Sequence, residues 1–302
     1  MLSVKYIDKD IITEPAENII RILAPNPSPM TFNGTNTYII DNGELAIIDP
    51  GPVHKKHFIN ILSVISGRPV KYIFITHSHI DHSPLAKQLS AELNTPIYGY
   101  GAPDKGLSST MLSLIENGYE SASEGIDYEF IPDFCIKNND NFELNNSIIT
   151  AIHTPGHMAN HVCFQYGKVL FSGDHVMGWA TSLVSPPYGD LTQFMTSCRL
   201  LKNKEFELFL PGHGDLVINP SERLNFLINH RLEREEQIKT SIKTKPLTAS
   251  EITQKIYTDV DKSLIPAATR NVFAHLIDLR ERGLVKFHGV ISEKTKVSFL
   301  KP

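Results

Sequence analysis

The sequence predicts an α/β protein in two parts, a larger mixed domain over residues 1–230 and a smaller helical domain over residues 231–302. Short apolar runs rich in β-branched residues alternate with turn signals in the first part, whereas helical periodicity dominates the second. The 302 residues are 41% hydrophobic, which is enough to bury one large core and one small one. We therefore expect a sheet-based domain followed by a small appendage.

Strands dominate the expected elements of the first part. A hairpin is expected at Asp41-Asn42-Gly43, because Asn-Gly suits the positive φ that such turns need. A helix is expected over residues 84–93, with Pro84 in its first turn, where a missing N–H costs little. Residues 99–133 show little periodicity and are expected to form a long helix-and-loop excursion. The expected strands are residues 37–40, 45–48, 70–75, 148–152, 162–166, 169–171 and 207–210, and a further helix is expected over residues 191–201.

The second part has the outline of a winged helix. A long charged helix over residues 224–242 leads into Thr248-Ala-Ser-Glu251, which has the spacing of a capping box and opens a helix to about residue 257. Another helix follows over residues 267–282 and ends at Gly283. Residues 284–287 and 297–300 are expected to pair as a small β-ribbon.

Charge is distributed unevenly between the two parts. The net charge of −4 argues against a histone-like protein. Residues 231–302 carry 14 Lys+Arg against 9 Asp+Glu, a net of +5, so the rest of the chain carries −9. Ordinary surface solvation explains this difference, and a basic tail for an acidic polymer is the alternative.

Cysteines and terminal residues indicate the compartment. The three cysteines, Cys135, Cys163 and Cys198, lack C-x-x-C spacing and are expected to be buried thiols in a reducing compartment. The first ten residues contain several charged side chains and no apolar core of signal-peptide length. No apolar stretch in the sequence approaches ~18 residues. We therefore expect a cytoplasmic protein that does not bind or span a membrane.

The most informative string is Thr76-His-Ser-His-Ile-Asp-His82, directly after an expected buried strand. Three imidazoles and a carboxylate at a strand end are difficult to explain structurally, and they are zinc-type donors. Three more fragments repeat the order of strand, tight turn and metal-competent side chain. They are His153-Thr-Pro-Gly-His157, Ser172-Gly-Asp174 and Pro211-Gly-His213-Gly.

This ordered set of motifs resembles the metallo-β-lactamase superfamily over residues 30–215, and Asn33-Gly-Thr-Asn-Thr-Tyr38 resembles its opening hairpin. The resemblance implies an αββα sandwich with the site on its edge. It implies that Asp49 supports the site without binding metal. The implied ligands are His77, His79 and His157 for one zinc ion, Asp81, His82 and His213 for a second, and Asp174 as a bridge between both.

The chemistry follows from such a ligand set. Two divalent cations roughly 3.5–4 Å apart acidify a bridging water, so a hydroxide can attack a carbonyl carbon or a phosphorus. We therefore expect a zinc-dependent hydrolase with two zinc ions per chain, with Asp81 and Asp174 as its catalytic carboxylates. His79 favours zinc, because oxygen-reducing diiron relatives carry a carboxylate there.

The substrate stays open between several classes. The Asp81-His-Ser-Pro84 string and residues 184–190 are similar to the lactamase-beta-like endoribonuclease subfamily and its bacterial relatives, which implies single-stranded RNA. A glyoxalase-II-like thioesterase or other acyl hydrolase is the alternative, although Ser83-Pro84 replaces the usual Gly-Gly. The non-enzyme alternative is a nucleic-acid-binding regulator with structural metals. We expect a small-molecule or RNA substrate, with a homo-oligomer as an open alternative.

The basic second part has two interpretations. Its side chains could govern substrate access by holding a phosphate backbone, or the segment could simply pack on the core or on a second subunit.

Eight histidines lie outside the ligand set. His153, His161 and His175 lie beside ligands in the sequence, so orientation of a ligand or contact with substrate is open for each. The other five are expected at the surface: His54, His57, His230, His275 and His288. For Trp179, packing is expected rather than stacking on a substrate.

Overall fold

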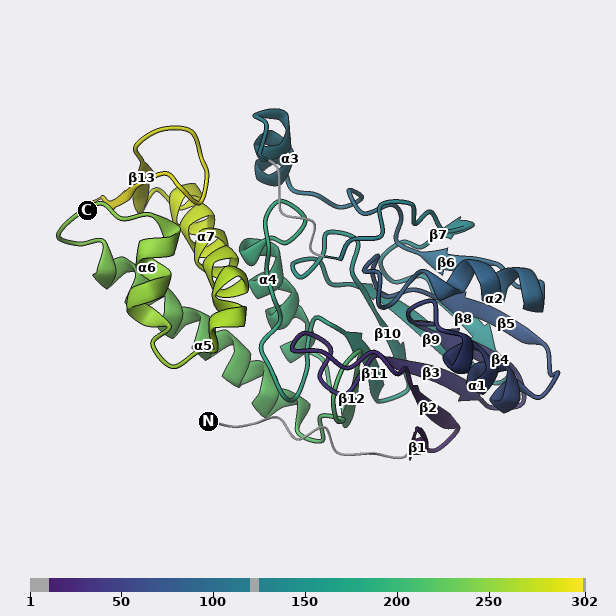
Figure 1. Cartoon of the computed structure of the whole chain (residues 1–302). Coiled ribbons are helices and arrows are strands. Elements are labelled where there is room, and N and C mark those ends of the chain that lie inside the picture. The colour runs from purple at the N-terminus through teal and green to yellow at the C-terminus, as the bar shows by residue number, and fades with distance from the viewer. Residues whose placement is uncertain (1–10, 120–124, 301–302) are drawn as a thin grey trace.

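The computed structural model describes residues 11–119 and 125–300 and contains two β-sheets packed face to face (Figure 1). Helices cover both outer faces of this pair of sheets, so the expected αββα sandwich is confirmed. The C-terminal helices lie beside α4, at the end of the molecule away from α1 and α2 (Figure 1).

The first sheet has strands in the sequential order β1 to β7. Its strands are β1 (Ile12–Ala16), β2 (Ile19–Leu23), β3 (Asn36–Asp41), β4 (Leu45–Ile48), β5 (Val70–Phe74), β6 (Ile97–Gly99) and β7 (Phe134–Cys135). Pairing is antiparallel from β1 to β4 and parallel from β4 to β7. The predicted β3–β4 hairpin is confirmed, and Gly43 has a φ of +100° in its turn.

The second sheet has the order β12-β11-β10-β9-β8. Its strands are β8 (Asn141–Leu144), β9 (Ser147–His153), β10 (Val162–Tyr166), β11 (Val169–Gly173) and β12 (Leu208–Pro211). All neighbours are antiparallel except β11 and β12, which are parallel. The carboxyl ends of β11 and β12 therefore lie side by side.

Two-residue periodicity explains how the layers are sorted. In β3, Tyr38 and Ile40 point into the core between the sheets, whereas Ile39 points to the outer face. There it packs with Ile61 and Ile65 of α1 (Lys55–Ile65), and α2 (Leu85–Leu93) covers the same face. Successive strand side chains face opposite sides, so strands covered on both faces read as continuous apolar runs.

The other outer face is covered by α4 (Leu191–Lys202) and by the long helix α5 (Pro220–Ser241). Leu224 and Leu227 of α5 pack in the sandwich, whereas Ile238 and the following Ile242 pack in the core of the C-terminal part. The predicted boundary between residues 1–230 and 231–302 thus falls inside a continuous helix, and it stays a prediction.

The C-terminal part is a winged-helix domain, as the sequence predicts. It contains α6 (Ala249–Ile256), a 3-10 helix η1 (Lys262–Leu264), α7 (Ile265–Glu281) and a ribbon of β13 (Val285–Phe287) and β14 (Val297–Phe299). Both bonds of the Thr248–Glu251 capping box are present. Ala274 of α7 packs in the apolar cluster between the second sheet and its covering helices, so the domain docks on the first part.

Several expectations about single residues are wrong. His57 and His275 are buried rather than exposed, and His230 is half-buried, because helices α1, α5 and α7 turn them inward. All three cysteines are free, but Cys135 lies on the short strand β7 and is exposed.

The excursion over residues 99–133 contains α3 (Ser109–Glu116), which packs on the C-terminal core, and its residues 120–124 lie outside the described residues. Within the described chain, no helix combines the length and the apolar character needed to cross a membrane.

Candidate metal centre

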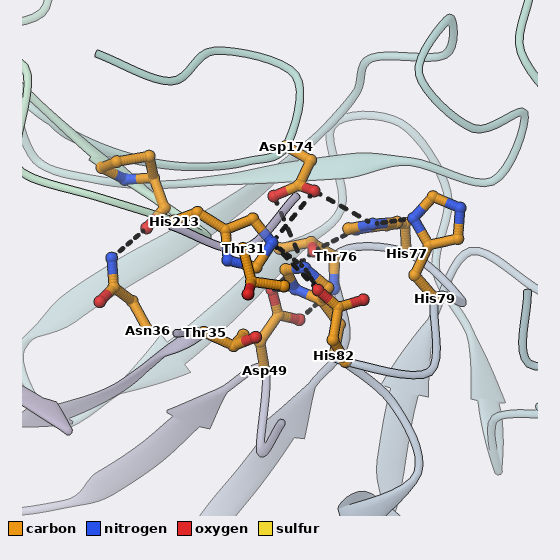
Figure 2. A network of polar contacts seen from close by, with 12 residues as sticks. Thr31, Thr35, Asn36, Asp49, Thr76, His77, His79, His82, Asp174 and His213 are labelled. Atoms are coloured by element: carbon orange, nitrogen blue, oxygen red, sulfur yellow. Dashed lines mark hydrogen bonds and ion pairs between the residues drawn. The ribbon is translucent and has the colours of Figure 1, made fainter. Parts of the chain in front are cut away.

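The candidate ligands follow the ends of strands and lie at one edge of the sandwich. The Thr76–His82 loop follows β5, Asp174 follows β11, and His213 follows β12. His157 follows β9 after the turn at Pro155-Gly156. Figure 2 shows the Asp174 carboxylate pointing at His77, His82 and His213. The structure thus brings all seven predicted side chains together.

The side chains form two groups, each with potential ligand atoms within 4.8 Å of one another. The first group is His77, His79, His157 and Asp174, and the second is Asp81, His82 and His213. These are the two sets that the family resemblance implies.

In the first group, three imidazole nitrogens converge. His79 Nδ1 lies 2.9 Å from His77 Nε2 and 3.2 Å from His157 Nε2. Asp174 Oδ2 lies 3.6 Å from His157 Nε2 and 3.9 Å from His77 Nε2. Lone pairs gathered at one point repel one another unless a cation or a proton lies between them.

The second group is built around His213. Its Nε2 lies 3.0 Å from Asp81 Oδ2 and 3.3 Å from His82 Nε2. Asp174 faces this group as well, with Oδ1 3.5 Å from His82 Nε2 and Oδ2 3.4 Å from His213 Nε2. Asp174 is therefore the carboxylate that lies between the two groups.

Four of the imidazoles are oriented through their second nitrogen. The partners are Thr76 Oγ1 for His77 (2.9 Å), Asp49 Oδ2 for His82 (2.8 Å), the Leu183 carbonyl for His157 (2.7 Å) and the Gly34 carbonyl for His213 (3.1 Å). A carbonyl or carboxylate accepts a hydrogen from Nδ1, which leaves Nε2 to face the site. Asp49 thus supports His82 from outside the cluster, as expected.

Asp49 and Thr76 connect the two groups. Asp49 adopts a left-handed φ of +51° directly after β4. Its Oδ1 accepts from the Thr76 amide at 2.8 Å, and its Oδ2 accepts from Thr76 Oγ1 at 2.7 Å. Thr76 opens the Thr76–His82 string, but the sequence does not indicate that its hydroxyl contacts both Asp49 and His77.

Electrostatics differ between the two groups. Burial, reinforced by neighbouring imidazoles, lowers the pKa of His77 and His157 and takes the pKa of His79 to about 3. Burial opposes protonation in the second group too, but nearby carboxylates outweigh it. They raise the pKa of His82 well above its usual value and that of His213 to about 10. A bound cation would supply the positive charge that these protons carry.

Two observations show that the cluster fits a metal ion. Asp174 Oδ1 is buried and has no hydrogen-bond partner among the described residues. A Cβ on Gly212 would lie 2.5 Å from Asp174 Oδ1 and 2.6 Å from His82 Cε1. Only a glycine at this position leaves the space beside these two side chains open. The His/Asp cluster can hold a metal ion.

The loop that carries Leu183 is held by the C-terminal domain. The Ser182 carbonyl accepts from Arg231 Nη2, and the Val184 amide donates to Asn271 Oδ1 at 3.0 Å. Arg231 Nη1 donates to the same Asn271 oxygen at 3.0 Å. No sequence motif identifies Arg231 or Asn271, because α5 and α7 come together only in the folded chain.

The other histidines near the cluster are packed. His161 and His175 are buried and their rings lie 5.8 Å apart, whereas His153 stacks on Tyr100 with ring centroids 3.7 Å apart. Trp179 stacks on Phe32 with ring centroids 5.0 Å apart, and it also lines the cavity described next.

A cavity of about 410 Å³ opens from the cluster toward the C-terminal domain. The metal end is lined by His79, Asp81, His157, Asp174 and His213. Apolar walls come from both domains and include Met30, Met177, Leu183, Val260 and Leu264. Its volume lies within the range of roughly 300–1,000 Å³ typical of small-molecule sites.

Comparisons with known proteins agree with this geometry. The model of the Metallo-beta-lactamase superfamily matches residues 30–213. The chain belongs to the metallo-β-lactamase superfamily. A second model, the Beta-lactamase associated winged helix domain, matches residues 248–293 of this superfamily member. With the ligand cluster in place, the chain is a metal-dependent hydrolase.

Relatives and solved structures extend over most of the chain. It is 28% identical to the Beta-lactamase-like protein 2 homolog of Drosophila melanogaster, covering 91% of this chain and 92% of that protein. It is 28% identical to the Atrochrysone carboxyl ACP thioesterase of Passalora fulva, covering 79% and 68%. The crystal structure of a Beta-lactamase domain protein from Burkholderia ambifaria matches with a TM-score of 0.78 at 20% identity, covering 96% of this chain and 93% of that one.

Proposed function

We propose that the protein is a zinc hydrolase that holds two zinc ions and cleaves an acyl compound, a thioester in particular. One observation carries the choice of substrate class. The cavity that begins at the ligand cluster is walled mainly by apolar side chains, and Arg234 is the only Lys or Arg among its described lining residues. Such a wall suits an apolar acyl chain better than a polyanion.

The donor set supports two ions. His77, His79 and His157 would hold one zinc ion, Asp81, His82 and His213 would hold the other, and Asp174 would serve both. All are imidazole or carboxylate donors, which are zinc ligands, and three protein ligands beside a shared carboxylate leave room for substrate. Zinc ions bound there would supply a hydroxide near neutral pH and polarise the carbonyl oxygen.

The protein's own groups hold this arrangement in place. Asp81 and Asp174 are the two carboxylates among the described residues that line the cavity, and we propose them as the catalytic pair. Burial alone would raise the pKa of each, but the imidazoles of His82 and His213 lower it, so both stay ionised at neutral pH. They can therefore accept a proton or bind a cation.

Two further findings bear on the substrate class. Several relatives carry thioesterase names, among them the Passalora fulva protein and Thioesterase pkgB of Emericella nidulans. Single-stranded RNA is the second candidate, favoured by the net charge of +5 on residues 231–302. Part of that charge is not available to a polymer, because Arg231 is buried.

The direct test compares three substrates. Zinc-loaded protein is given an octanoyl thioester of N-acetylcysteamine, bis(p-nitrophenyl) phosphate and a short labelled RNA, each with and without chelator. We expect thioester hydrolysis that the chelator abolishes and that exceeds phosphodiester cleavage. Chelator-sensitive RNA cleavage without thioester turnover would overturn the acyl proposal.

Two variants separate chemistry from folding in that assay. His82→Ala should lower turnover by at least about two orders of magnitude, since it removes a ligand of a Lewis acid that contributes several kcal/mol. His288→Ala should stay within about twofold, because His288 is exposed and its side chain contacts Ser298 on the ribbon. Equal effects of both changes would show that the cluster is not the reaction centre.

A further inference from the structure

The cavity contains a cation supplied by the C-terminal domain. Arg234 lies on α5, and its guanidinium carbon sits 4.0 Å from the centre of the Tyr257 ring at the end of α6. Its Nη1 donates to Gln237 Oε1 at 2.7 Å and to the Ile256 carbonyl at 3.0 Å. Within the described chain, no carboxylate forms an ion pair with Arg234, although other arginines of this domain do pair with acids.

Two polar atoms beside this charge lack partners. Arg234 Nε and His230 Nδ1 are both buried without a hydrogen-bond partner among the described residues, and both side chains line the cavity. Buried polar groups are nearly always satisfied, so two orphan atoms in one cavity point to a polar ligand. Burial, reinforced by the charge of Arg231, lowers the pKa of His230 to about 4. Of the two side chains, His230 is therefore neutral near pH 7 and Arg234 carries the positive charge.

The cavity therefore has two polar regions and an apolar wall. The metal cluster provides one region, Arg234 and His230 provide the other, and apolar side chains such as Leu183 and Leu264 line the space they share. A guanidinium recognises carboxylate and phosphate oxygens through its planar N–H groups, and such charge-assisted bonds are about twice as strong as neutral ones.

We propose that Arg234 binds an anionic oxygen group of the substrate, while the metal cluster binds the bond to be cleaved. The inference rests on the proposed function and narrows it to thioesters that carry a second, negatively charged end. That anion is either a carboxylate on the acyl chain or the phosphate of the thiol carrier. His230 completes the subsite, because its free Nδ1 can share a hydrogen bond with the same group.

Binding rather than turnover gives the clearest test, because it does not depend on the reaction being the proposed one. Isothermal titration of the zinc-loaded full chain compares two matched pairs of probes: octanedioate with octanoate, and phosphopantetheine with pantetheine. Octanedioate carries one carboxylate more than octanoate, and phosphopantetheine carries a phosphate that pantetheine lacks. We expect the member of one pair with the additional anionic group to bind about tenfold or more tightly than its counterpart without it. The pair that shows the preference identifies which anion the subsite takes.

Variants assign the preference to the residue. Arg234→Met should abolish the preference and leave binding of the probe without the additional anionic group nearly unchanged, whereas Arg234→Lys should retain part of the preference. Arg199→Met is the matched control, because Arg199 is exposed in the last turn of α4. A purely structural role of Arg234 in joining α5 to α6 would instead weaken both members of each pair alike.

Two results would overturn the proposal. One is a wild-type protein that binds neither octanedioate nor phosphopantetheine more tightly than its counterpart in the pair. The other is an Arg234→Met variant that keeps the wild-type preference. A protein that shows the Arg234-dependent preference but hydrolyses no thioester would overturn the proposed function and leave the anion subsite standing.

Discussion

Asp49→Asn tests how the cluster is held without removing a ligand. Asp49 accepts three hydrogen bonds, two from Thr76 and one from His82 Nδ1, at 2.7 to 2.8 Å. An amide of the same shape cannot satisfy them all. In one orientation its NH2 group faces the Thr76 amide, and in the other it faces His82 Nδ1 and favours the tautomer with hydrogen on Nε2. The negative charge that supports His82 is lost in both.

We expect the site that contains His82 to bind zinc about 10- to 100-fold more weakly, as is typical for loss of a residue that orients a ligand. This corresponds to about 1.4–2.7 kcal/mol, in line with one charged hydrogen bond. The assay is competition with a chromophoric zinc chelator, repeated in a His79→Ala background to isolate that site. Asp133→Asn is the control, because Asp133 accepts a backbone N–H from Ile97 at 2.7 Å, on β6. Unchanged affinity in Asp49→Asn, or an equal loss in Asp133→Asn, would refute the reasoning.

Two further substitutions probe the space and the support around the cluster. Gly212→Ala places a Cβ 2.5 Å from the Asp174 carboxylate, so metal affinity and turnover should fall at least tenfold. Gly178→Ala is the control, because its Cβ would lie 3.4 Å from the nearest atom. Elemental analysis and kinetics should therefore show little change in that variant. Asn271→Ala removes an acceptor that fixes the loop whose carbonyl orients His157, and we expect about tenfold weaker zinc binding by chelator competition with a near-normal circular dichroism spectrum. Wild-type zinc affinity in Asn271→Ala would show that the C-terminal domain does not support the metal site.

Local signals were sufficient to predict much of the fold. Residues 45–48 and 162–166 match β4 and β10, because short and mostly apolar runs suit strands that are largely buried. The Thr248–Glu251 capping box predicts the start of α6, since its two bonds are formed within one turn. The ligand motifs were predictable for the same reason, because each combines a strand end with a donor a few residues later.

Elements whose stability depends on distant contacts were not predicted. Helix α1 begins at two lysines with His54 as its N-cap, so no usual capping residue announces it, although His57, Ile61 and Ile65 repeat at the spacing of a buried helical face. Strands β1, β2 and β6 to β8 were likewise missed. The cavity joins α5 and α7 to loops far away in the sequence, so neither the role of Asn271 nor the position of Arg234 has a local signal.

Zinc stoichiometry tests the central claim most directly. The protein is reconstituted with excess zinc, dialysed against metal-free buffer and examined by elemental analysis, together with Asp174→Ala. Because the seven donors form two groups that share Asp174, we expect about two zinc ions per chain in the wild type and a loss of more than about one ion in the variant. About half an ion or less per wild-type chain would contradict the account.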